Sequence, residues 1–412
     1  MTRFLKKITA AAVTVTVILS LFAISVSAFD YGERMDCFKN YGSPIVCVAH
    51  RGDWHNYPEN SAEAVKTAAE YGVVSVDVKI TSDGKTVLMA DDTLGRMCVD
   101  GSGKTVSGNV NSYTLAEIKE MFLRNANGTV KNSKTDFHPA SLTEAVETAK
   151  GEAVLMLTLK CADFKAVYEE VKSLNALDGV VFRFTDKNKT VLNTVSGIKD
   201  ITICGNYQGN IIFMATSVVK NCREQGVCTV ELGSKNGHGV LYDNFLMKRF
   251  NADNRAMVSM VNGRCGKRTD NEMGWDDLIS RGYSIIETDY PSELCAYIQR
   301  IDAERDQLER YISLYENTDT APYTTDTESV FVSAVNDGKA LLQGPASLSE
   351  LENARFNLQS AFDNLTVGQK KAVTLAFQFS WGRFAAALLC GAAILVSQIL
   401  LYKRREKKGE TK

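Results

Sequence analysis

The sequence predicts an α/β fold: a (β/α)8 TIM barrel, followed by a small helical hairpin and one C-terminal transmembrane helix. Over roughly 250 residues, short apolar runs rich in β-branched side chains alternate with amphipathic stretches. These runs are continuous, as expected of parallel strands covered on both faces. An open doubly wound sheet is the alternative, but no Gly-x-Gly-x-x-Gly turn supports it. The eight predicted strands are Ile45–Ala49, Val73–Ile80, Val154–Leu159, Val180–Phe184, Ile201–Cys204, Val227–Leu232, Ala256–Val261 and Tyr283–Glu287.

The N-terminal segment, residues 1–28, is typical of a secretory signal peptide. Basic residues precede an apolar run at 8–26, and Val26-Ser27-Ala28 offers the small side chains of a cleavage site. An uncleaved signal anchor is the alternative. Because either segment directs the following chain across the membrane, we expect the barrel to be extracellular.

A second apolar segment, residues 384–402, carries no charge and is long enough for one membrane-spanning helix, which needs about 20 residues. Trp381 precedes this segment, and the basic tail 403–412 follows it. An aromatic residue at one boundary and cations beyond the other are typical of a span whose C-terminus is cytoplasmic. A buried core helix is the alternative, although the basic tail disfavours it. We therefore expect a single-pass protein of the cell membrane, with a cytoplasmic tail.

Charge and cysteine spacing argue against two classes of function. The net charge is −2 and no basic stripe lies between the termini, so we expect no nucleic-acid partner. The ten cysteines show no Cys-x-x-Cys or Cys/His spacing of a zinc site. Neither the disulfide pattern nor the oligomeric state can be predicted from the cysteines.

The region after the barrel is predicted to be helical. We place the barrel at 44–300 and a helical stalk at 301–370, with a polar linker at 317–327. Two amphipathic helices are predicted within the stalk, at 330–342 and 348–365. The simplest interpretation is a stalk that holds the barrel away from the membrane. A module for surface interactions is the alternative.

Candidate functional residues lie where predicted strands end, because the active groups of a TIM barrel lie at the carboxyl ends of its strands. His50 and Arg51 follow the first strand, Asp77 lies on the second, and Lys160 ends the third. A histidine, an arginine and a carboxylate from neighbouring strands can bind and cleave a phosphodiester. This pattern predicts a phosphoester site at one mouth of the barrel.

Six motifs extend the pattern over about residues 44–300. They are VAHRG at 48–52, PENS at 58–61, VDVKITSDGKTVLMADDTLGR at 76–96, HPASLTEAVETAK at 138–150, LTLK at 157–160 and GYSIIETDYPSEL at 282–294. In their order and spacing, these motifs closely resemble the glycerophosphodiester phosphodiesterase family. The resemblance implies a TIM barrel, phosphoric diester hydrolysis and a role in lipid metabolism.

The resemblance also implies a cofactor, a divalent calcium or magnesium ion. Two carboxylates spaced Glu-x-Asp on the second strand and a third from a Glu-x-Lys on the third strand would hold this ion. The ion and an arginine would withdraw charge from the phosphate. Two histidines would serve as general acid and base.

The family pattern is partly present in this chain. His50 and Arg51 match its catalytic histidine and arginine, and Arg51 and Lys160 match its phosphate-binding residues. Asp77 matches one metal ligand. Glu59 is expected to support His50 or Asp77 without touching the ligand.

Three family positions carry other residues. Ser75 stands where the first glutamate belongs, Thr158 where the third carboxylate belongs, and Ala90 where the second histidine belongs. A hydroxyl is a poor substitute for a carboxylate on a hard cation. Losing one general acid or base typically costs 10²–10⁴-fold in rate.

Three functions follow as hypotheses. The first is a membrane-anchored pseudoenzyme that binds a glycerophosphodiester or an envelope phosphoester. The second is an active metal-dependent phosphodiesterase that releases glycerol phosphate. The third is a surface scaffold whose helical stalk mediates interactions. The substituted residues Ser75, Ala90 and Thr158 favour the first.

Overall fold

The computed structural model describes most of the chain between residues 31 and 368. The described residues are 31–39, 44–128, 133–185, 188–195, 197–199, 201–208, 227, 229–233, 247, 250–251, 255–261, 265 and 268–368. The predicted signal peptide at 1–28, the predicted span at 384–402 and the basic tail at 403–412 lie outside these residues. Among the helices within them, none combines the length and the apolar character needed to cross a membrane.

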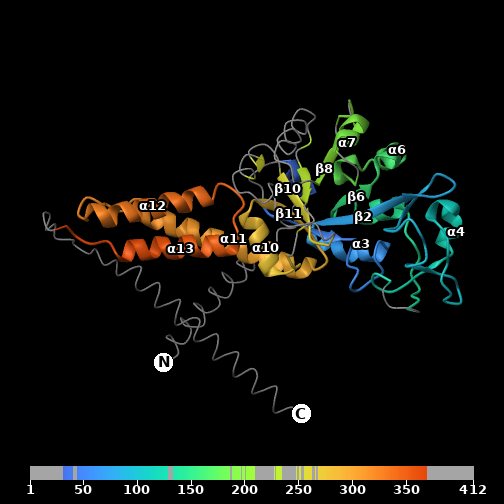
Figure 1. Cartoon of the computed structure of the whole chain (residues 1–412), viewed down its shortest axis with the longest axis horizontal. Coiled ribbons are helices and arrows are strands. Elements are labelled where there is room, and N and C mark those ends of the chain that lie inside the picture. Colours follow the sequence, from blue (N-terminus) through green and yellow to red (C-terminus); the bar gives the residue numbers. More distant parts are fainter. Residues whose placement is uncertain are drawn as a thin grey trace, which may run out of the picture. The chain divides into compact units, whose positions relative to one another are not determined.

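Eight parallel strands form a closed barrel (Figure 1). Each strand pairs with its neighbours in chain order, and the last pairs with the first. This arrangement confirms the predicted eight-stranded barrel. The strands are β1 (Val46–His50), β2 (Val73–Ile80), β6 (Val154–Leu159), β7 (Val180–Phe184), β8 (Thr202–Gln208), β9 (Thr229–Gly233), β10 (Arg255–Ser259) and β11 (Tyr283–Thr288).

The connections carry the remaining elements. A short strand, β3, pairs antiparallel with β2, and β4 pairs with β5 in a separate two-stranded sheet. The strands span Thr86–Leu88 (β3), Cys98–Val99 (β4) and Phe122–Leu123 (β5). The helices around the barrel are α2 (Tyr31–Lys39), α3 (Ala62–Ala68), α4 (Leu115–Lys119), α5 (Leu142–Ala149), α6 (Phe164–Ser173), α7 (Asn188–Val195) and α10 (Glu272–Ser280).

The barrel interior changes from apolar to polar along its axis. Val48, Met156, Val181, Met257 and Ile285 come from five different strands and form one buried cluster. The same cluster includes side chains of α2, which therefore covers the amino-terminal end of the barrel. Towards the carboxyl ends of the strands, the buried side chains become polar and charged. The mouth predicted from the sequence is therefore lined by groups that can do chemistry.

Strand boundaries differ from the prediction where polar residues face inward. β8 runs on to Gln208, beyond the predicted end at Cys204, and β10 begins at Arg255 rather than Ala256. Arg255 is buried because Ser284 and backbone carbonyl groups accept its hydrogen bonds. A charged side chain can therefore lie within a strand, provided that its partners are buried with it.

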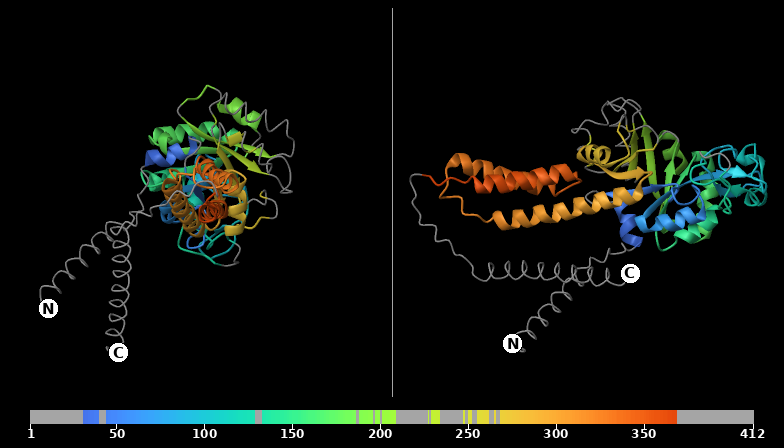
Figure 2. Two further views of the ribbon diagram at one scale, coloured as in Figure 1. Left: turned by 90° about the vertical axis from the view of Figure 1, so that its left-hand side faces the viewer. Right: turned by 90° about the horizontal axis from the view of Figure 1, so that it is seen from below.

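The C-terminal helices form a three-helix bundle (Figure 2). α11 (Pro291–Tyr315) packs against β1, and α12 (Thr325–Leu341) and α13 (Leu348–Asp363) pack against the later part of α11. The core of the bundle contains buried leucine, isoleucine and phenylalanine side chains, and Gly338 lets α12 approach Ile312. The predicted pair of helices is therefore covered on one side by α11.

One bound within the predicted stalk needs correction, and one contact ties the stalk to the barrel. α12 begins at Thr325, inside the predicted linker 317–327, because Asp326 and Glu328 lie in its first turn and favour a helix N-terminus. At the start of α13, Ser349 donates its backbone N–H to Asp276 of α10, at 3.1 Å. The bundle is thus hydrogen-bonded to a helix of the barrel.

Candidate active site at the mouth of the barrel

His50 ends β1 and is oriented by a carboxylate that follows β11, the last strand of the barrel. Its Nδ1 atom lies 2.7 Å from Oδ1 of Asp289, which also accepts a hydrogen bond of 2.8 Å from Nε1 of Trp54. Since a carboxylate accepts, Nδ1 carries the proton, and Nε2 is the nitrogen available to a ligand. The side chain of His50 is 13% exposed, so part of the ring is within reach of solvent.

The loop after His50 has an unusual backbone. Arg51 and Asn60 adopt φ angles of 58° and 56°, and Gly52 adopts 80°. A Cβ atom on Gly52 would lie 2.6 Å from the backbone carbon of Ala64, so only glycine fits there. The N–H of Asn60 donates to the carbonyl of Arg51 at 3.0 Å, which closes the loop. Positive φ at two non-glycine residues costs free energy and is characteristic of functional sites.

Arg51 holds two carboxylates. Its Nε donates to Oδ2 of Asp77 at 2.9 Å, and its Nη1 lies 3.0 Å from Oε2 of Glu59. Arg96 contacts the other oxygen of Glu59 at 2.5 Å and also binds Asp91 at 2.6 Å. Burial alone would lower the pKa of Arg51, but Asp77 and Glu59 raise it. We call Arg51, Glu59, Asp77 and Arg96 the Arg51 cluster.

Glu59 has a different role from the predicted one. It was expected to support His50 or Asp77, but its carboxylate contacts Arg51 and Arg96. The side chain is 1% exposed, and two guanidinium groups compensate its buried charge. Its partner Arg96 comes from the segment between β2 and β6 and was not among the predicted site residues.

The positions that would hold a divalent ion do not form a hard-cation site. Asp77 Oδ2 accepts from Arg51 and, at 3.3 Å, from the side-chain amide of Asn60. The hydroxyl of Ser75 donates to Oε1 of Glu287 at 2.7 Å, and Thr158 offers only a second hydroxyl. Among the residues that the structure describes, no group of three or more His, Cys, Asp or Glu side chains could hold a metal ion. The donors present therefore do not fit calcium or magnesium.

Two further predicted positions lie toward the rim. Lys160 is 54% exposed, and its Nζ lies 3.6 Å from Asp92, which accepts a shorter hydrogen bond of 2.6 Å from Lys79. Ala90 carries no polar group, and Asp91 beside it binds Arg96. The structure thus brings His50, Arg51 and Asp77 together but leaves Lys160 more exposed than these three.

Three charged residues at the mouth were not predicted as site residues. Arg183 of β7 contacts Glu231 of β9 and Glu287 of β11, and all three side chains are buried. A sequence signal was present, because each is a charged residue within a buried strand. We call these residues the Arg183 triad.

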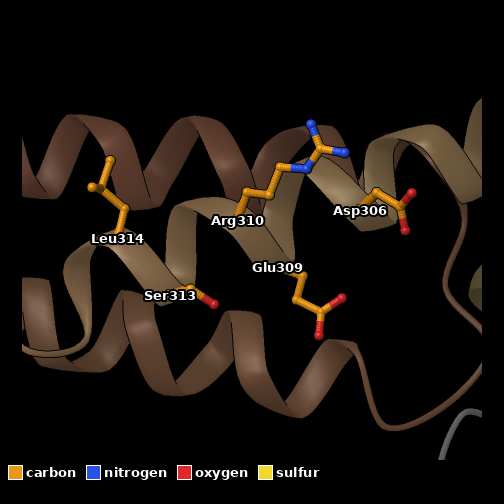
Figure 3. Close-up of a pocket in the computed structure, with 5 residues that line it drawn as sticks. All are labelled: Asp306, Glu309, Arg310, Ser313 and Leu314. Atoms are coloured by element: carbon orange, nitrogen blue, oxygen red, sulfur yellow. The ribbon is translucent and has the colours of Figure 1, made fainter. Parts of the chain in front are cut away.

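Two surface pockets lie away from these residues, on the C-terminal helices. One of about 590 Å³ lies on α11 and is lined by Asp306, Glu309, Arg310, Ser313 and Leu314 (Figure 3). Another, of about 890 Å³, lies over α12 and α13. Neither is lined by a residue predicted to bind phosphate or metal.

Several curated proteins are similar in sequence to part of this chain. The mouse (Mus musculus) protein "Glycerophosphodiester phosphodiesterase 1" is 28% identical over 168 residues, which cover 37% of this chain and 49% of that protein. A glycerophosphodiester phosphodiesterase of Caldanaerobacter subterraneus is 41% identical over 78 residues, which cover 18% of this chain and 30% of the relative. The chain thus spans about half the length of the mouse relative, and less of the bacterial one.

Solved structures share the fold. A glycerophosphoryl diester phosphodiesterase from Parabacteroides distasonis superposes with a TM-score of 0.53 at 18% identity, covering 66% of this chain and 92% of that one. A putative glycerophosphoryl diester phosphodiesterase from Silicibacter pomeroyi gives 0.52 at 18% identity, covering 63% and 95%. The family model described as "Glycerophosphoryl diester phosphodiesterase family" matches residues 50–218, from His50 onward. Residues 50–218 of this chain are therefore a domain of the glycerophosphoryl diester phosphodiesterase family.

Proposed function

We propose that this chain binds a phosphoester at the barrel mouth and does not hydrolyse it by the metal-dependent route of its family. One observation carries the proposal. Arg51 is held in place by Glu59 and Asp77, whereas two of the three expected metal ligands, Ser75 and Thr158, are hydroxyls. A ligand can therefore be bound while the main electrostatic contribution to catalysis is missing.

The anion-binding groups are Arg51 and His50. Nε and Nη1 of Arg51 contact carboxylates, and no described residue bonds to Nη2, so this atom can donate to a phosphate oxygen. Nε2 of His50 offers a second contact on the same mouth. Because Glu59 and Asp77 fix the guanidinium beforehand, little side-chain entropy is lost when the ligand binds.

The ligand class follows from the family. We propose a glycerophosphodiester or an envelope phosphoester that presents one phosphate to Arg51. An active phosphodiesterase remains the second candidate, because the contact between His50 and Asp289 is the arrangement that a general base requires. Turnover measurements separate the two.

The test uses the full chain purified in detergent. Binding of glycerophosphocholine is measured by calorimetry, and hydrolysis of the same compound is followed with and without calcium. We expect binding without turnover, and an affinity loss of at least about 100-fold in Arg51→Ala, because the buried carboxylate of Glu59 also loses one of its two arginine partners. Arg300→Ala, which removes an exposed arginine paired with Glu272, is the matched control and should bind normally.

Calcium-dependent turnover that His50→Ala abolishes would establish the enzyme instead. A companion variant reinstates the family residues through Ser75→Glu, Ala90→His and Thr158→Glu together. If the three substitutions restore turnover to an inactive protein, these positions account for the loss of activity.

We further propose that residues 384–402 anchor the protein in the cell membrane, with the barrel outside. The uncharged length of this segment and the basic residues 403–412 support the proposal. Protease added to intact cells should remove the barrel and spare an epitope placed after residue 412. Protection of the barrel in intact cells would contradict this topology.

A further inference from the structure

The Arg183 triad places a fixed positive charge inside the barrel. Nε and Nη2 of Arg183 lie 3.1 and 3.0 Å from Oε2 of Glu231, and Nη1 lies 2.5 Å from Oε1 of Glu287. The exposed fraction of all three side chains is 5% or less. One guanidinium thus joins strands β7, β9 and β11 across the interior.

The triad lies in the same layer as the substituted metal positions. Oε1 of Glu287 accepts from Ser75 at 2.7 Å, so β11 supplies a carboxylate beside the position where β2 lacks one. Arg183 is the strand neighbour of Thr158, and Thr158 is the strand neighbour of Asp77. Where the family pattern has a glutamate on β2 and a carboxylate on β6, this chain has hydroxyls, and a guanidinium and two carboxylates lie on β7, β9 and β11 instead.

We propose that Arg183 is the resident cation of this mouth, taking the electrostatic place that a divalent ion would hold among carboxylates. The mouth then assembles without metal and excludes a divalent ion. This inference rests on the proposed function, in which the site binds its ligand without a metal, and names the group that replaces the metal.

The electrostatics agree with this geometry. Burial alone would lower the pKa of Arg183, but Glu231 and Glu287 raise it, so the guanidinium stays charged. Burial would raise the pKa of Glu287, but Arg183 holds it at about 2, so the carboxylate is ionised. A divalent ion entering this layer would meet a fixed cation already bound to both carboxylates, and the repulsion is strong where water is excluded.

The test measures cation binding to the full chain in detergent, in the absence of any phosphoester. After treatment with EDTA, calcium and magnesium are added while thermal unfolding is followed. Wild type should show no change of Tm beyond about 1 °C. Arg183→Ser should unfold at a lower temperature in EDTA and recover at least about 3 °C with millimolar calcium, because Glu231 and Glu287 then lack a cation.

A control that removes all three charges identifies the site of any response. Arg183→Ser combined with Glu231→Gln and Glu287→Gln has no buried charge to compensate, so calcium should leave its Tm unchanged. If calcium still stabilises this control, the cation binds elsewhere and the inference is overturned. An Arg183→Ser variant that folds but is not stabilised by calcium overturns the inference as well. Stabilisation of wild type by either cation, abolished by Glu287→Gln, also overturns it.

If Arg183→Ser does not fold, the titration of wild type with calcium and magnesium is sufficient to test the inference. In that case, wild type without a cation response supports the inference, and a cation response that depends on Glu287 overturns it. Because no phosphoester is present, either result leaves the binding and turnover measurements of the proposed function unaffected. Failure of the inference and failure of the proposed function are therefore distinguishable.

Discussion

The two guanidinium clusters at the mouth use the same chemistry in different settings. Arg51 is about a quarter exposed and lies on a loop with positive φ angles, whereas Arg183 lies on a regular strand and is buried with both carboxylates. A strained, reachable guanidinium can give part of its hydrogen-bonding capacity to a ligand. A buried guanidinium uses its hydrogen bonds to hold the strands of the barrel together. The comparison teaches that the surroundings of an arginine, rather than its partners, indicate its role.

The largest expected effect comes from Arg183→Met. The substitution leaves two buried carboxylates without their cation, and breaking such a pair typically costs about 3–5 kcal/mol. Urea unfolding in EDTA should show a loss of this size in the free energy of unfolding. Adding Glu231→Gln and Glu287→Gln should recover most of it, since a neutral replacement of a buried ion cluster is often tolerated. A loss below about 1 kcal/mol would show that the triad is hydrated in solution.

Acid should act on the same triad. The folded pKa of Glu287 is about 2, below its ordinary value of 4.5, so its contribution is present above pH 4.5 and is lost as the pH falls towards 2. A shift of this size corresponds to about 3 kcal/mol. Unfolding measured between pH 5 and 2 should reveal the loss, and Glu287→Gln should flatten this part of the curve. An unchanged slope in the variant would contradict the assignment.

On the Arg51 side, the backbone is the sensitive feature. In Gly52→Ala, a residue with a φ of 80° gains a Cβ atom 2.6 Å from the backbone of Ala64. We therefore expect the free energy of unfolding, measured in urea, to fall by about 2–3 kcal/mol. Gly84→Ala is the matched control, because its φ of 71° is similar but nothing lies within 4 Å. The control should lose only about 1 kcal/mol. Equal losses would mean that the loop relaxes around the added methyl group.

Asp289→Asn should change ligand binding more than stability. An asparagine amide can donate to Nδ1 of His50, which would move the ring proton to Nε2 and alter the contact with a phosphate. We expect affinity for glycerophosphocholine to fall about tenfold, equivalent to 1.4 kcal/mol. Nitrogen NMR of the labelled histidine should report the change of tautomer. Weaker binding with an unchanged tautomer would assign Asp289 a different role.

Much of the barrel could be predicted from the sequence because its strands are buried on both faces. The predicted bounds of β2, β6 and β7 match the structure residue for residue. β8 and β10 differ at their ends, since Asn206 and Arg255 are polar and their partners lie far away in the sequence. Local hydrophobicity carries no information about such partners.

In the candidate site, too, the residues of a local motif could be predicted, whereas those with distant partners could not. His50 and Arg51 lie in a contiguous motif, and the structure brings Asp77 to them. The Arg183 triad was missed because its partners are 48 and 104 residues from Arg183, so no charged partner stands near any of the three in the sequence pattern of its own strand. Asp289 was not predicted as a site residue, because its contact with His50 exists only after the barrel closes.

The smallest expected effect, from Lys160→Ala, tests where the site ends. Because Lys160 is half exposed and its contact with Asp92 is long, the free energy of unfolding should change by less than about 0.5 kcal/mol. Affinity for glycerophosphocholine should fall only about two- to threefold, and this difference should disappear at high salt, which screens exposed charges. The loss in Arg51→Ala should persist at high salt, because Arg51 and its partners are better shielded from solvent. A loss for Lys160→Ala that equals the Arg51→Ala loss and resists salt would place Lys160 in direct contact with the phosphate, so that the binding site would extend from the Arg51 cluster to the rim.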